Sequence, residues 1–209
     1  MVDKITSWKF VEEFIEEPVS TLKARARADE FGIECVTPAT GAQLAFIASS
    51  LGAKSIVEAG TGAGVSGLWL LSASTNSILA TIDDEPDYQA AAKLAFQDAN
   101  IADNRTRVIS GKVTEVMSNM ADAAYDLVFL DADKETLEEQ LHESVRLLRP
   151  GGAVVIAHAL WRDRVPDPAM RDEATVAYRD AMRFLAQNEN FVTAVSTVGD
   201  GLVMASKRS

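Results

Sequence analysis

Residues 55–67 read Ser-Ile-Val-Glu-Ala-Gly-Thr-Gly-Ala-Gly-Val-Ser-Gly, an apolar, β-branched run that breaks into closely spaced glycines. The run suits a buried strand, because β-branched side chains pack well on a pleated sheet. Gly60, Gly62 and Gly64 allow tight turns and let the backbone approach a ligand where a Cβ atom would collide. From Gly64 the sequence turns helical, so free N–H groups of a first helical turn would face that ligand. The pattern predicts a strand–turn–helix unit that binds a nucleotide.

Two acidic residues strengthen this interpretation. Glu58 lies at the carboxyl end of the expected strand, where a carboxylate is costly to bury unless it binds something. Asp83 closes the next expected strand, residues 77–82. It lies about 20 residues downstream, where a carboxylate can accept hydrogen bonds from ribose hydroxyls.

Two cofactors remain compatible with the glycines. Residues 62–67 match the dinucleotide pattern Gly-x-Gly-x-x-Gly, and residues 58–62 match the S-adenosylmethionine pattern Glu-x-Gly-x-Gly. In a dinucleotide fold the first glycine directly follows the strand, which here is Gly60, and the third glycine would then fall on Val65. Glu58 also has a natural partner in the ammonium group of S-adenosylmethionine, which a pyrophosphate lacks. We therefore favour S-adenosylmethionine, with an NAD(P)-dependent oxidoreductase as the alternative.

Composition narrows the class of protein. The chain has 209 residues, 47% hydrophobic and 24% charged, which is ordinary for a globular protein. Its net charge of −11 repels phosphate backbones, so a nucleic-acid partner is not expected. The single cysteine, Cys35, cannot form an internal disulfide, which fits a reducing compartment. We expect its side chain to be a small buried hydrophobic group. No stretch approaches the roughly 20 apolar residues that span a bilayer. We expect a cytoplasmic protein without a membrane partner.

The rest of the chain alternates between strand-like and helix-like segments, which is typical of parallel α/β architecture. The final two strands, 191–198 and 202–206, are separated only by Gly199-Asp200-Gly201 and predict a hairpin. Residues 1–209 should form a single α/β domain with a mostly parallel, Rossmann-like sheet that ends in an antiparallel strand. The other expected strands are 55–58, 77–82, 105–110, 125–131 and 153–157, and the intervening helices begin near 64, 86, 113, 136 and 171.

Residues 1–53 are expected to form an N-terminal helical cap. Residues 7–31 have helical spacing with an interruption at Pro18, and Thr37-Pro38 predicts an N-cap followed by a helix to about Leu51. The first helix carries an apolar stripe that would form either part of the core or a dimer surface, and we expect a homodimer. The stripe consists of Trp8, Val11, Phe14 and Ile15.

Taken together, the chain resembles the bacterial O-methyltransferases related to catechol and caffeoyl-CoA O-methyltransferases over nearly its whole length. The resemblance rests on residues 57–71, on Thr81-Ile-Asp83, on Tyr-Asp-Leu-Val-Phe-Leu-Asp-Ala-Asp-Lys at 125–134, and on Leu-Leu-Arg-Pro-Gly-Gly at 147–152. It implies a class I methyltransferase fold with a seven-stranded sheet and S-adenosylmethionine as cofactor. It also implies a small, phenolic or catechol-like hydroxyl acceptor.

The resemblance implies which residues hold the cofactor. Asp83 would bind the ribose, and Val36 and Thr37 would cover the carboxylate. Lys112 departs from the small or acidic residue often seen at its position. The adenine would be flanked by Asp84, Gly111, Lys112 and Val113, and the methionine end would be contacted by Glu58, Gly60, Gly62, Gly64 and Ser66, with Thr61 and Asp131 among the cofactor-binding residues.

Asp131 and Lys134 are the expected catalytic residues. Asp131 ends the expected fourth strand at the carboxyl edge of the sheet, where ligands bind in open α/β folds, although it could instead cap the helix near Thr136. In the family the equivalent of Asp131 is a divalent-metal ligand, and the equivalent of Lys134 receives the substrate hydroxyl's proton. Burial would have to lower the pKa of Lys134, which the neighbouring acids Asp131 and Asp133 oppose.

The chain departs from the family at residues 156–161, which read Ile-Ala-His-Ala-Leu-Trp where the family supplies an Asp-Asn pair. Ala157 cannot bind a metal, and the imidazole of His158 favours softer ions than magnesium. We therefore expect methyl transfer to depend little on magnesium, with only Asp131 and His158 as candidate metal ligands. A protein that binds S-adenosylmethionine without catalysis is the further alternative.

The acceptor pocket is expected in the regions that the shared fold constrains least. These are the N-terminal helices, the loop at residues 161–164 and the helix from Arg171. Trp161 would either stack on an aromatic acceptor or pack in the core. His142, inside the helix from 136, is expected to be a surface or packing residue.

Overall fold

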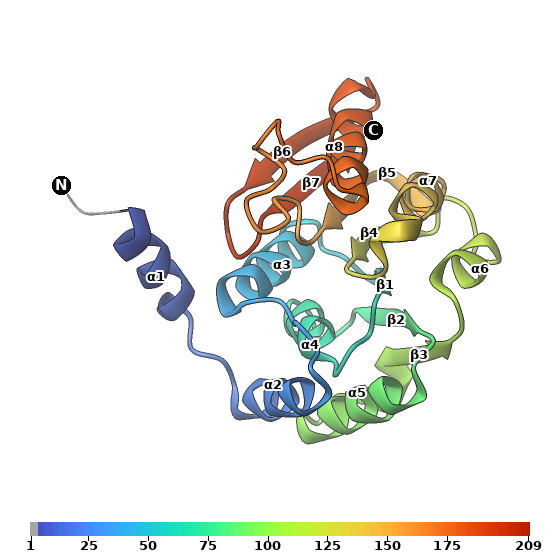
Figure 1. The fold of residues 1–209 in the computed structure, drawn as a ribbon. Coiled ribbons are helices and arrows are strands. Elements are labelled where there is room, and N and C mark those ends of the chain that lie inside the picture. Colours follow the sequence, from blue (N-terminus) through green and yellow to red (C-terminus); the bar gives the residue numbers. More distant parts are fainter. Residues whose placement is uncertain (1–3) are drawn as a thin grey trace.

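The computed structural model describes residues 4–209, so residues 1–3 of the expected cap lie outside the described part. Seven strands form one sheet with the order β3-β2-β1-β4-β5-β7-β6 (Figure 1). Only β7 runs antiparallel to its neighbours β5 and β6, which confirms the predicted parallel sheet with a C-terminal hairpin. The strands are β1 Ser55–Ala59, β2 Ile78–Asp83, β3 Thr106–Ser110, β4 Tyr125–Leu130, β5 Leu148–Ile156, β6 Phe191–Ser196 and β7 Leu202–Lys207.

The helices follow the predicted order. Thr37 caps α3 by accepting a hydrogen bond from the backbone N–H of Thr40, and Pro38 occupies the first helical position. Between residues 4 and 209 there is no helix with the length and apolar character needed to cross a membrane. The helices are α1 Lys4–Phe14, α2 Val19–Phe31, α3 Pro38–Ser50, α4 Val65–Ser72, α5 Pro86–Asp98, α6 Val113–Ser118, α7 Leu137–Leu147 and α8 Glu173–Gln187, with short 3₁₀ turns η1 Asp103–Arg105 and η2 Lys134–Thr136.

The fifth strand is longer than its apolar run predicts. Leu148 already pairs with Tyr125, and the register then shifts before Leu127 pairs with Ala153. Residues 149–152 form this irregular segment, and Gly151 adopts a positive φ of 80°. Because a bulged strand keeps pairing on both sides of the irregularity, the Arg-Pro-Gly-Gly sequence lies inside β5 rather than before it.

Side chains of the central strands alternate between two hydrophobic layers, as expected for a sheet covered on both faces. On one face Ile56, Leu127, Phe129 and Val155 pack with side chains of α3, α4 and α5. On the other face the intervening residues pack against α7 and α8. This second set comprises Val57, Val128, Leu130, Val154 and Ile156 with Leu137, Leu141, Tyr178 and Leu185.

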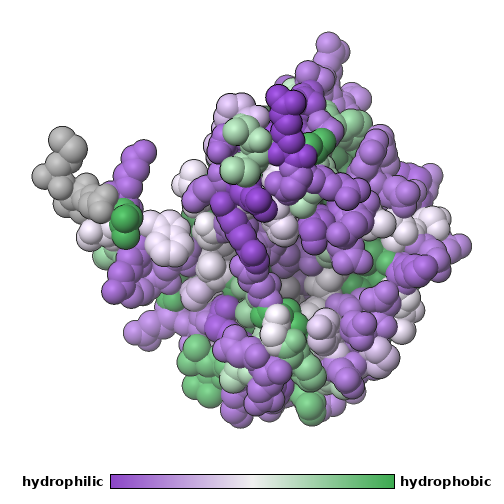
Figure 2. Space-filling view, viewed as in Figure 1, coloured by the Kyte–Doolittle hydropathy of each residue, from purple (hydrophilic) through white to green (hydrophobic). Residues whose placement is uncertain are grey.

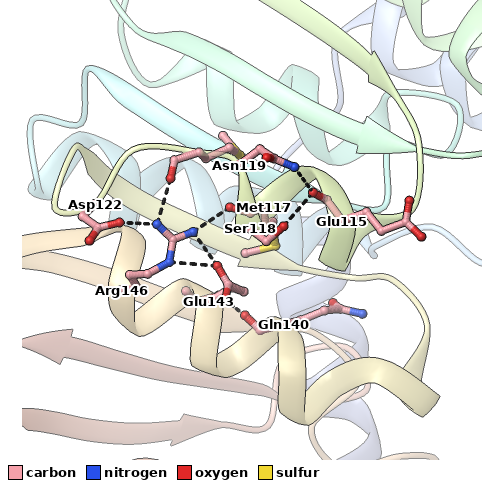
Figure 3. Close-up of polar contacts among 10 residues, drawn as sticks. Glu115, Met117, Ser118, Asn119, Asp122, Gln140, Glu143 and Arg146 are labelled. Carbon is pink, nitrogen blue, oxygen red and sulfur yellow. Dashed lines mark hydrogen bonds and ion pairs between the residues drawn. The ribbon is translucent and has the colours of Figure 1, made fainter.

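Arg146 joins α7 to the end of α6. Its guanidinium donates hydrogen bonds to the carbonyl oxygens of Met117, at 2.7 Å, and Met120, at 2.8 Å (Figure 3). The Nε–H donates to Glu143 at 2.9 Å, and the same guanidinium pairs with Asp122. Because the last carbonyls of a helix have no partner within it, this side chain fixes the end of α6.

The first helix stands apart from the body of the molecule, as Figures 1 and 2 show at the left. None of its residues is buried, and Trp8 and Phe14 are 49% and 67% exposed. Glu12 holds it in place by accepting hydrogen bonds from the backbone N–H groups of Ala39 and Gly199, both at 3.2 Å. The apolar stripe is therefore not part of this chain's core, which leaves the dimer surface as its alternative.

Candidate active site

A cavity of about 930 Å³ lies at the carboxyl edge of the parallel strands. Its lining includes residues at or just after the carboxyl ends of β1 to β5, because parallel strands bring these ends to one edge of the sheet. The chain order reverses between β1 and β4, which is the switch point where open α/β sheets bind ligands. Gly60 and Asp131 meet there, and the backbone N–H of Asp131 donates to the Ala59 carbonyl at 2.9 Å.

The glycines of the turn after β1 are required mainly by packing within the protein. A Cβ on Gly60 would overlap the backbone carbonyl of Asp131, and one on Gly64 would press on Ala92 of α5 at 3.1 Å. Both glycines also have positive φ, 91° and 86°. Only Gly62 faces open space, with Ile33 at 3.5 Å from such a Cβ. The expected close approach of a ligand therefore explains Gly62 but not Gly60 or Gly64.

Asp83 shapes this turn as well as lining the cavity. Its Oδ2 accepts hydrogen bonds from the backbone N–H groups of Thr61 and Gly62, both at 3.0 Å. Its Oδ1 accepts one from Glu85 at 3.1 Å. Because a carboxylate offers about four acceptor positions, Asp83 keeps capacity for a ligand hydroxyl.

Glu58 lies beneath the turn and is not among the residues that line the cavity. Its side chain is fully buried, and Thr81 Oγ1 donates to Oε2 at 2.6 Å. Within residues 4–209 nothing forms a hydrogen bond with Oε1. Burial raises the pKa of Glu58 to about 7, although the hydrogen bond from Thr81 opposes the shift.

The end of the cavity beside β2 and β3 contains the residues expected around an adenine. Gly111 donates its backbone N–H to the Asp83 carbonyl at 3.1 Å, which places the start of α6 against β2. Lys112 is exposed and lies 3.9 Å from Glu115. Tyr88 of α5 also lines the cavity, and its ring lies 5.6 Å from that of Phe31.

His158 lies between two carboxylates at the other end of the cavity. Its Nε2 is 3.3 Å from Asp131 Oδ1, and its Nδ1 is 3.2 Å from Asp200 Oδ2. Burial lowers the pKa of His158, but the hydrogen bonds and charges of Asp131 and Asp200 together raise it to about 9. The ring is therefore a cation at neutral pH.

These residues do not fit the divalent-metal site that the family resemblance implies. Both ring nitrogens of His158 face carboxylates, Nε2 that of Asp131 at 3.3 Å and Nδ1 that of Asp200 at 3.2 Å, so neither nitrogen is directed at an open coordination position. Ala157 is buried and offers no donor atom. The described chain contains no group of three or more His, Cys, Asp or Glu side chains placed to hold a metal.

Aromatic side chains form one wall of the same end. Trp161 stacks on Tyr178 of α8 with ring centroids 5.4 Å apart and an interplanar angle of 29°. Lys134 Nζ lies 5.3 Å from the Trp161 centroid and 3.5 Å from Glu135. Burial raises the pKa of Tyr178, and the charges of Asp131 and Asp200 add to the shift. Trp161 and Tyr178 both line the cavity, and the guanidinium of Arg162 also lies over the Trp161 ring, 5.6 Å from its centroid.

Most residues expected at the site line the cavity, and four do not. Val36 is buried in the core, Thr37 caps α3, Glu58 is fully buried, and Gly64 faces Ala92 of α5. The lining residues among those expected are Gly60, Thr61, Gly62, Ser66, Asp83, Asp84, Gly111, Lys112, Val113, Asp131, Lys134 and His158. Residues that the motifs did not indicate include Ile33, Glu34, Cys35, Tyr88, Gln140 and Tyr178.

The chain is similar in sequence and in structure to known O-methyltransferases. A family model described as O-methyltransferase matches residues 13–208. A Mycobacterium tuberculosis protein named Probable O-methyltransferase Rv1220c is 45% identical over 199 residues, which cover 95% of this chain and 89% of that protein. A solved Corynebacterium glutamicum structure has a TM-score of 0.91 and 30% identity, covering 99% of this chain and 98% of its own. The O-methyltransferase TomG from Streptomyces achromogenes, in complex with S-adenosylmethionine, has a TM-score of 0.84 and 25% identity, with both chains covered completely.

Proposed function

Because the chain belongs to the O-methyltransferase family, we propose that its cavity binds S-adenosylmethionine over the glycine turn and a small hydroxyl-bearing acceptor beside Asp131 and His158. The observation that carries this proposal is Asp83, which lines the cavity at the end of β2 with acceptor capacity to spare. The complex of TomG with S-adenosylmethionine supports the choice of cofactor. The family assignment also decides against the oxidoreductase alternative.

Each part of the cofactor has a proposed place. The ribose hydroxyls would bind Asp83, the adenine would lie beside Asp84 and residues 111–113, and the methionine end would lie over residues 60–62 and Ser66. The buried Glu58, with one oxygen free of hydrogen bonds, would support the cofactor's ammonium group from below the turn. Val36 and Thr37, expected over the carboxylate, are not among the residues that line the cavity.

The bound cofactor supplies an electrophilic methyl group, and the chain's own side chains prepare the acceptor. A hydroxyl must lose its proton as it attacks, and we propose Lys134 as the residue that receives it. The Trp161–Tyr178 pair offers a flat surface, which suits an aromatic acceptor stacked beside Asp131. A phenolic or catechol-like acceptor is therefore the class that we propose.

The cofactor assignment predicts that S-adenosylmethionine and S-adenosylhomocysteine bind and that NAD does not. Asp83→Ala should weaken binding of S-adenosylmethionine by about 1–3 kcal/mol. The substitution removes a charged hydrogen-bond acceptor and leaves the backbone N–H groups of Thr61 and Gly62 without their partner. Isothermal titration calorimetry of both proteins measures this, with the exposed Asp103→Ala as the matched control. Tight NAD binding without binding of S-adenosylmethionine would refute the assignment.

The acceptor class is tested by transfer of a labelled methyl group from S-adenosylmethionine to a panel of phenols, catechols and aliphatic alcohols. Methylated phenols or catechols support the proposal. Methylation of aliphatic alcohols alone would refute the acceptor class but keep the reaction. Binding of the cofactor without methylation of any of them would favour the alternative of a binding protein without catalysis.

We further propose a homodimer formed through the apolar face of α1. Trp8, Val11 and Phe14 are all more than 40% exposed on a helix that buries nothing within its own chain. Light scattering should give twice the 22.5 kDa monomer mass. Phe14→Glu should yield the monomer, and Leu94→Glu, at an exposed position on α5, should not. A monomer at every accessible concentration of the unmodified chain would exclude this dimer.

The proposed partners and location follow from charge and cysteine content. The net charge of −11 argues for a small-molecule substrate and against nucleic acid. Cys35 is a free thiol with Arg25 beside it at 3.2 Å, so a reducing compartment suits it. The cytoplasm is the location that we propose.

A further inference from the structure

We propose that Gln140 is a specificity-determining residue of the cofactor site, whose side-chain oxygen Oε1 accepts a hydrogen bond from the exocyclic amine of the adenine. The side chain would thereby distinguish adenine from a purine that carries an oxygen at the same position. The inference rests on the proposed function, because it concerns the adenine end of the same cavity.

Gln140 combines deep burial with a hydrogen-bond acceptor that the protein itself does not use. The residue is 1% exposed, yet it belongs to the lining of the cavity. Within residues 4–209 no group donates a hydrogen bond to its Oε1. Among the described residues with such a buried, unpaired side-chain atom, only Gln140 lines the cavity. Because a buried carbonyl oxygen is costly to leave unpaired, Oε1 is suited to accept from a ligand.

The orientation of this amide is fixed by its nitrogen. Nε2 donates to the backbone carbonyl of Asp133 at 2.9 Å and to Thr136 Oγ1 at 2.8 Å. The Thr136 hydroxyl donates its own proton to the same carbonyl at 3.3 Å, so its oxygen is left to accept from Gln140. A reversed amide would bring two carbonyl oxygens together, and a carbonyl oxygen only accepts. The unpaired atom is therefore an acceptor, and the ligand group that fits it is an N–H or O–H donor.

The packing of α7 places this acceptor at the end of the cavity proposed for the adenine. Because α6 follows β3 and α7 follows β4, two parallel strands, both helices begin at the carboxyl edge of the sheet. The helices pack side by side in one hydrophobic cluster that includes Val113 and Leu141, and Arg146 joins their opposite ends (Figure 3). The start of α7, with Gln140, therefore lies beside the start of α6, where residues 111–113 would flank the adenine.

The amine is the cofactor group that matches this acceptor. It is the only N–H donor of the adenine ring, and it lies on the edge of the purine remote from the ribose, which is proposed at Asp83. A deaminated purine carries a carbonyl oxygen in its place, and two acceptors that face each other in a buried site leave both without a hydrogen bond. A site built to bond one ligand group rejects an analogue that lacks it.

Two ligands that differ by one deamination test the contact in the calorimeter. S-adenosylhomocysteine carries the amine, and S-inosylhomocysteine carries the carbonyl oxygen. We expect the wild-type protein to bind the first about 100-fold more tightly than the second. Gln140→Met keeps the length of the side chain but removes the acceptor, and it should lower this ratio of affinities by about 10-fold or more.

The ratio separates a ligand contact from a structural role, because a disturbed site would weaken both ligands alike. Gln43→Met is the matched control. The amide of Gln43 bonds to Met204 and Ser196, and none of these three residues lines the cavity, so this variant should keep the wild-type ratio. A wild-type ratio near one, or an unchanged ratio in Gln140→Met, would overturn the proposal.

A second measurement needs no variant and holds even if Gln140→Met does not fold. In a crystal structure of the wild-type protein with S-adenosylhomocysteine, the adenine amine should lie within hydrogen-bond distance of Gln140 Oε1. An amine that bonds elsewhere would overturn the proposal.

Failure of this inference is distinguishable from failure of the proposed function. If the wild-type protein binds neither S-adenosylmethionine nor S-adenosylhomocysteine, the proposed function fails. If it binds S-adenosylhomocysteine but shows no preference over S-inosylhomocysteine, the choice of cofactor stands and only the role of Gln140 fails.

Discussion

Gly60→Ala should abolish cofactor binding and destabilise the protein more than any other substitution in the glycine turn. The new Cβ would overlap the backbone carbonyl of Asp131, which is fixed because the neighbouring N–H of Asp131 is bonded to Ala59 in the sheet. Backbone at this position cannot move aside without separating the ends of β1 and β4. We expect a loss of about 2–4 kcal/mol in the free energy of unfolding, since overlap and a strained φ add together.

Gly52→Ala is the matched control for this substitution. Gly52 also has a positive φ, 57°, but a Cβ there would meet nothing within 4 Å. It should therefore show only the conformational cost of a left-handed alanine, about 1–2 kcal/mol, with unchanged cofactor affinity. Chemical denaturation and calorimetry measure both quantities. If Gly60→Ala bound S-adenosylmethionine as tightly as Gly52→Ala, the packing explanation of the turn would be wrong.

Glu58→Gln should remove a pH-dependent loss of stability that the wild-type protein shows between pH 4.5 and about 7. Burial is the main cause of the raised pKa of Glu58, so the folded state holds its proton more tightly than the unfolded state. The contribution of Glu58 to stability is then greatest below pH 4.5, falls as the pH rises to about 7, and stays reduced above it. At roughly 1.4 kcal/mol per pKa unit, the loss is about 3 kcal/mol.

The measurement is the difference in free energy of unfolding between Glu58→Gln and the wild-type protein at several pH values. The free energy of unfolding of the variant, minus that of the wild-type protein, should rise by up to about 3 kcal/mol as the pH rises from 4.5 to 8. The contributions of other titrating groups cancel in this difference. Glu115→Gln, at an exposed position, should show no such trend. If the proposed role of Glu58 is right, the variant should also bind S-adenosylmethionine more weakly. A difference that does not depend on pH would show that folding does not raise the pKa of Glu58.

Local sequence patterns predicted the architecture well, and they also indicated several residues that line the cavity. The alternation of apolar runs and helical segments gave the order of elements, because each run is bounded by residues that end it, such as Pro38 and Gly64. Asp83 and residues 111–113 follow or end strands, and parallel pairing alone brings them to one edge. The physical reason for Gly60 was not predictable, because Asp131 lies far away in sequence and reaches it only through sheet pairing.

The acceptor end depends on contacts between loops, which no local pattern encodes. The sequence marks Asp200 only as a turn residue, yet it meets His158 across 42 positions. Tyr178 has the spacing of an ordinary core residue of α8, and its contact with Trp161 arises only when the loop after β5 folds over that helix. Val36 and Thr37 were expected at the site from family resemblance, but the described structure uses them in the core and as a cap.

The most direct test of the account is a crystal structure of the protein with S-adenosylhomocysteine and catechol. We predict that the ribose hydroxyls bind Asp83, that the adenine lies beside residues 111–113, and that the sulfur faces the end of the cavity formed by Asp131 and His158. A catechol oxygen should then lie beside Asp131 and His158. The account would be contradicted if the cofactor lay outside this cavity, or if its sulfur pointed away from Asp131 and His158.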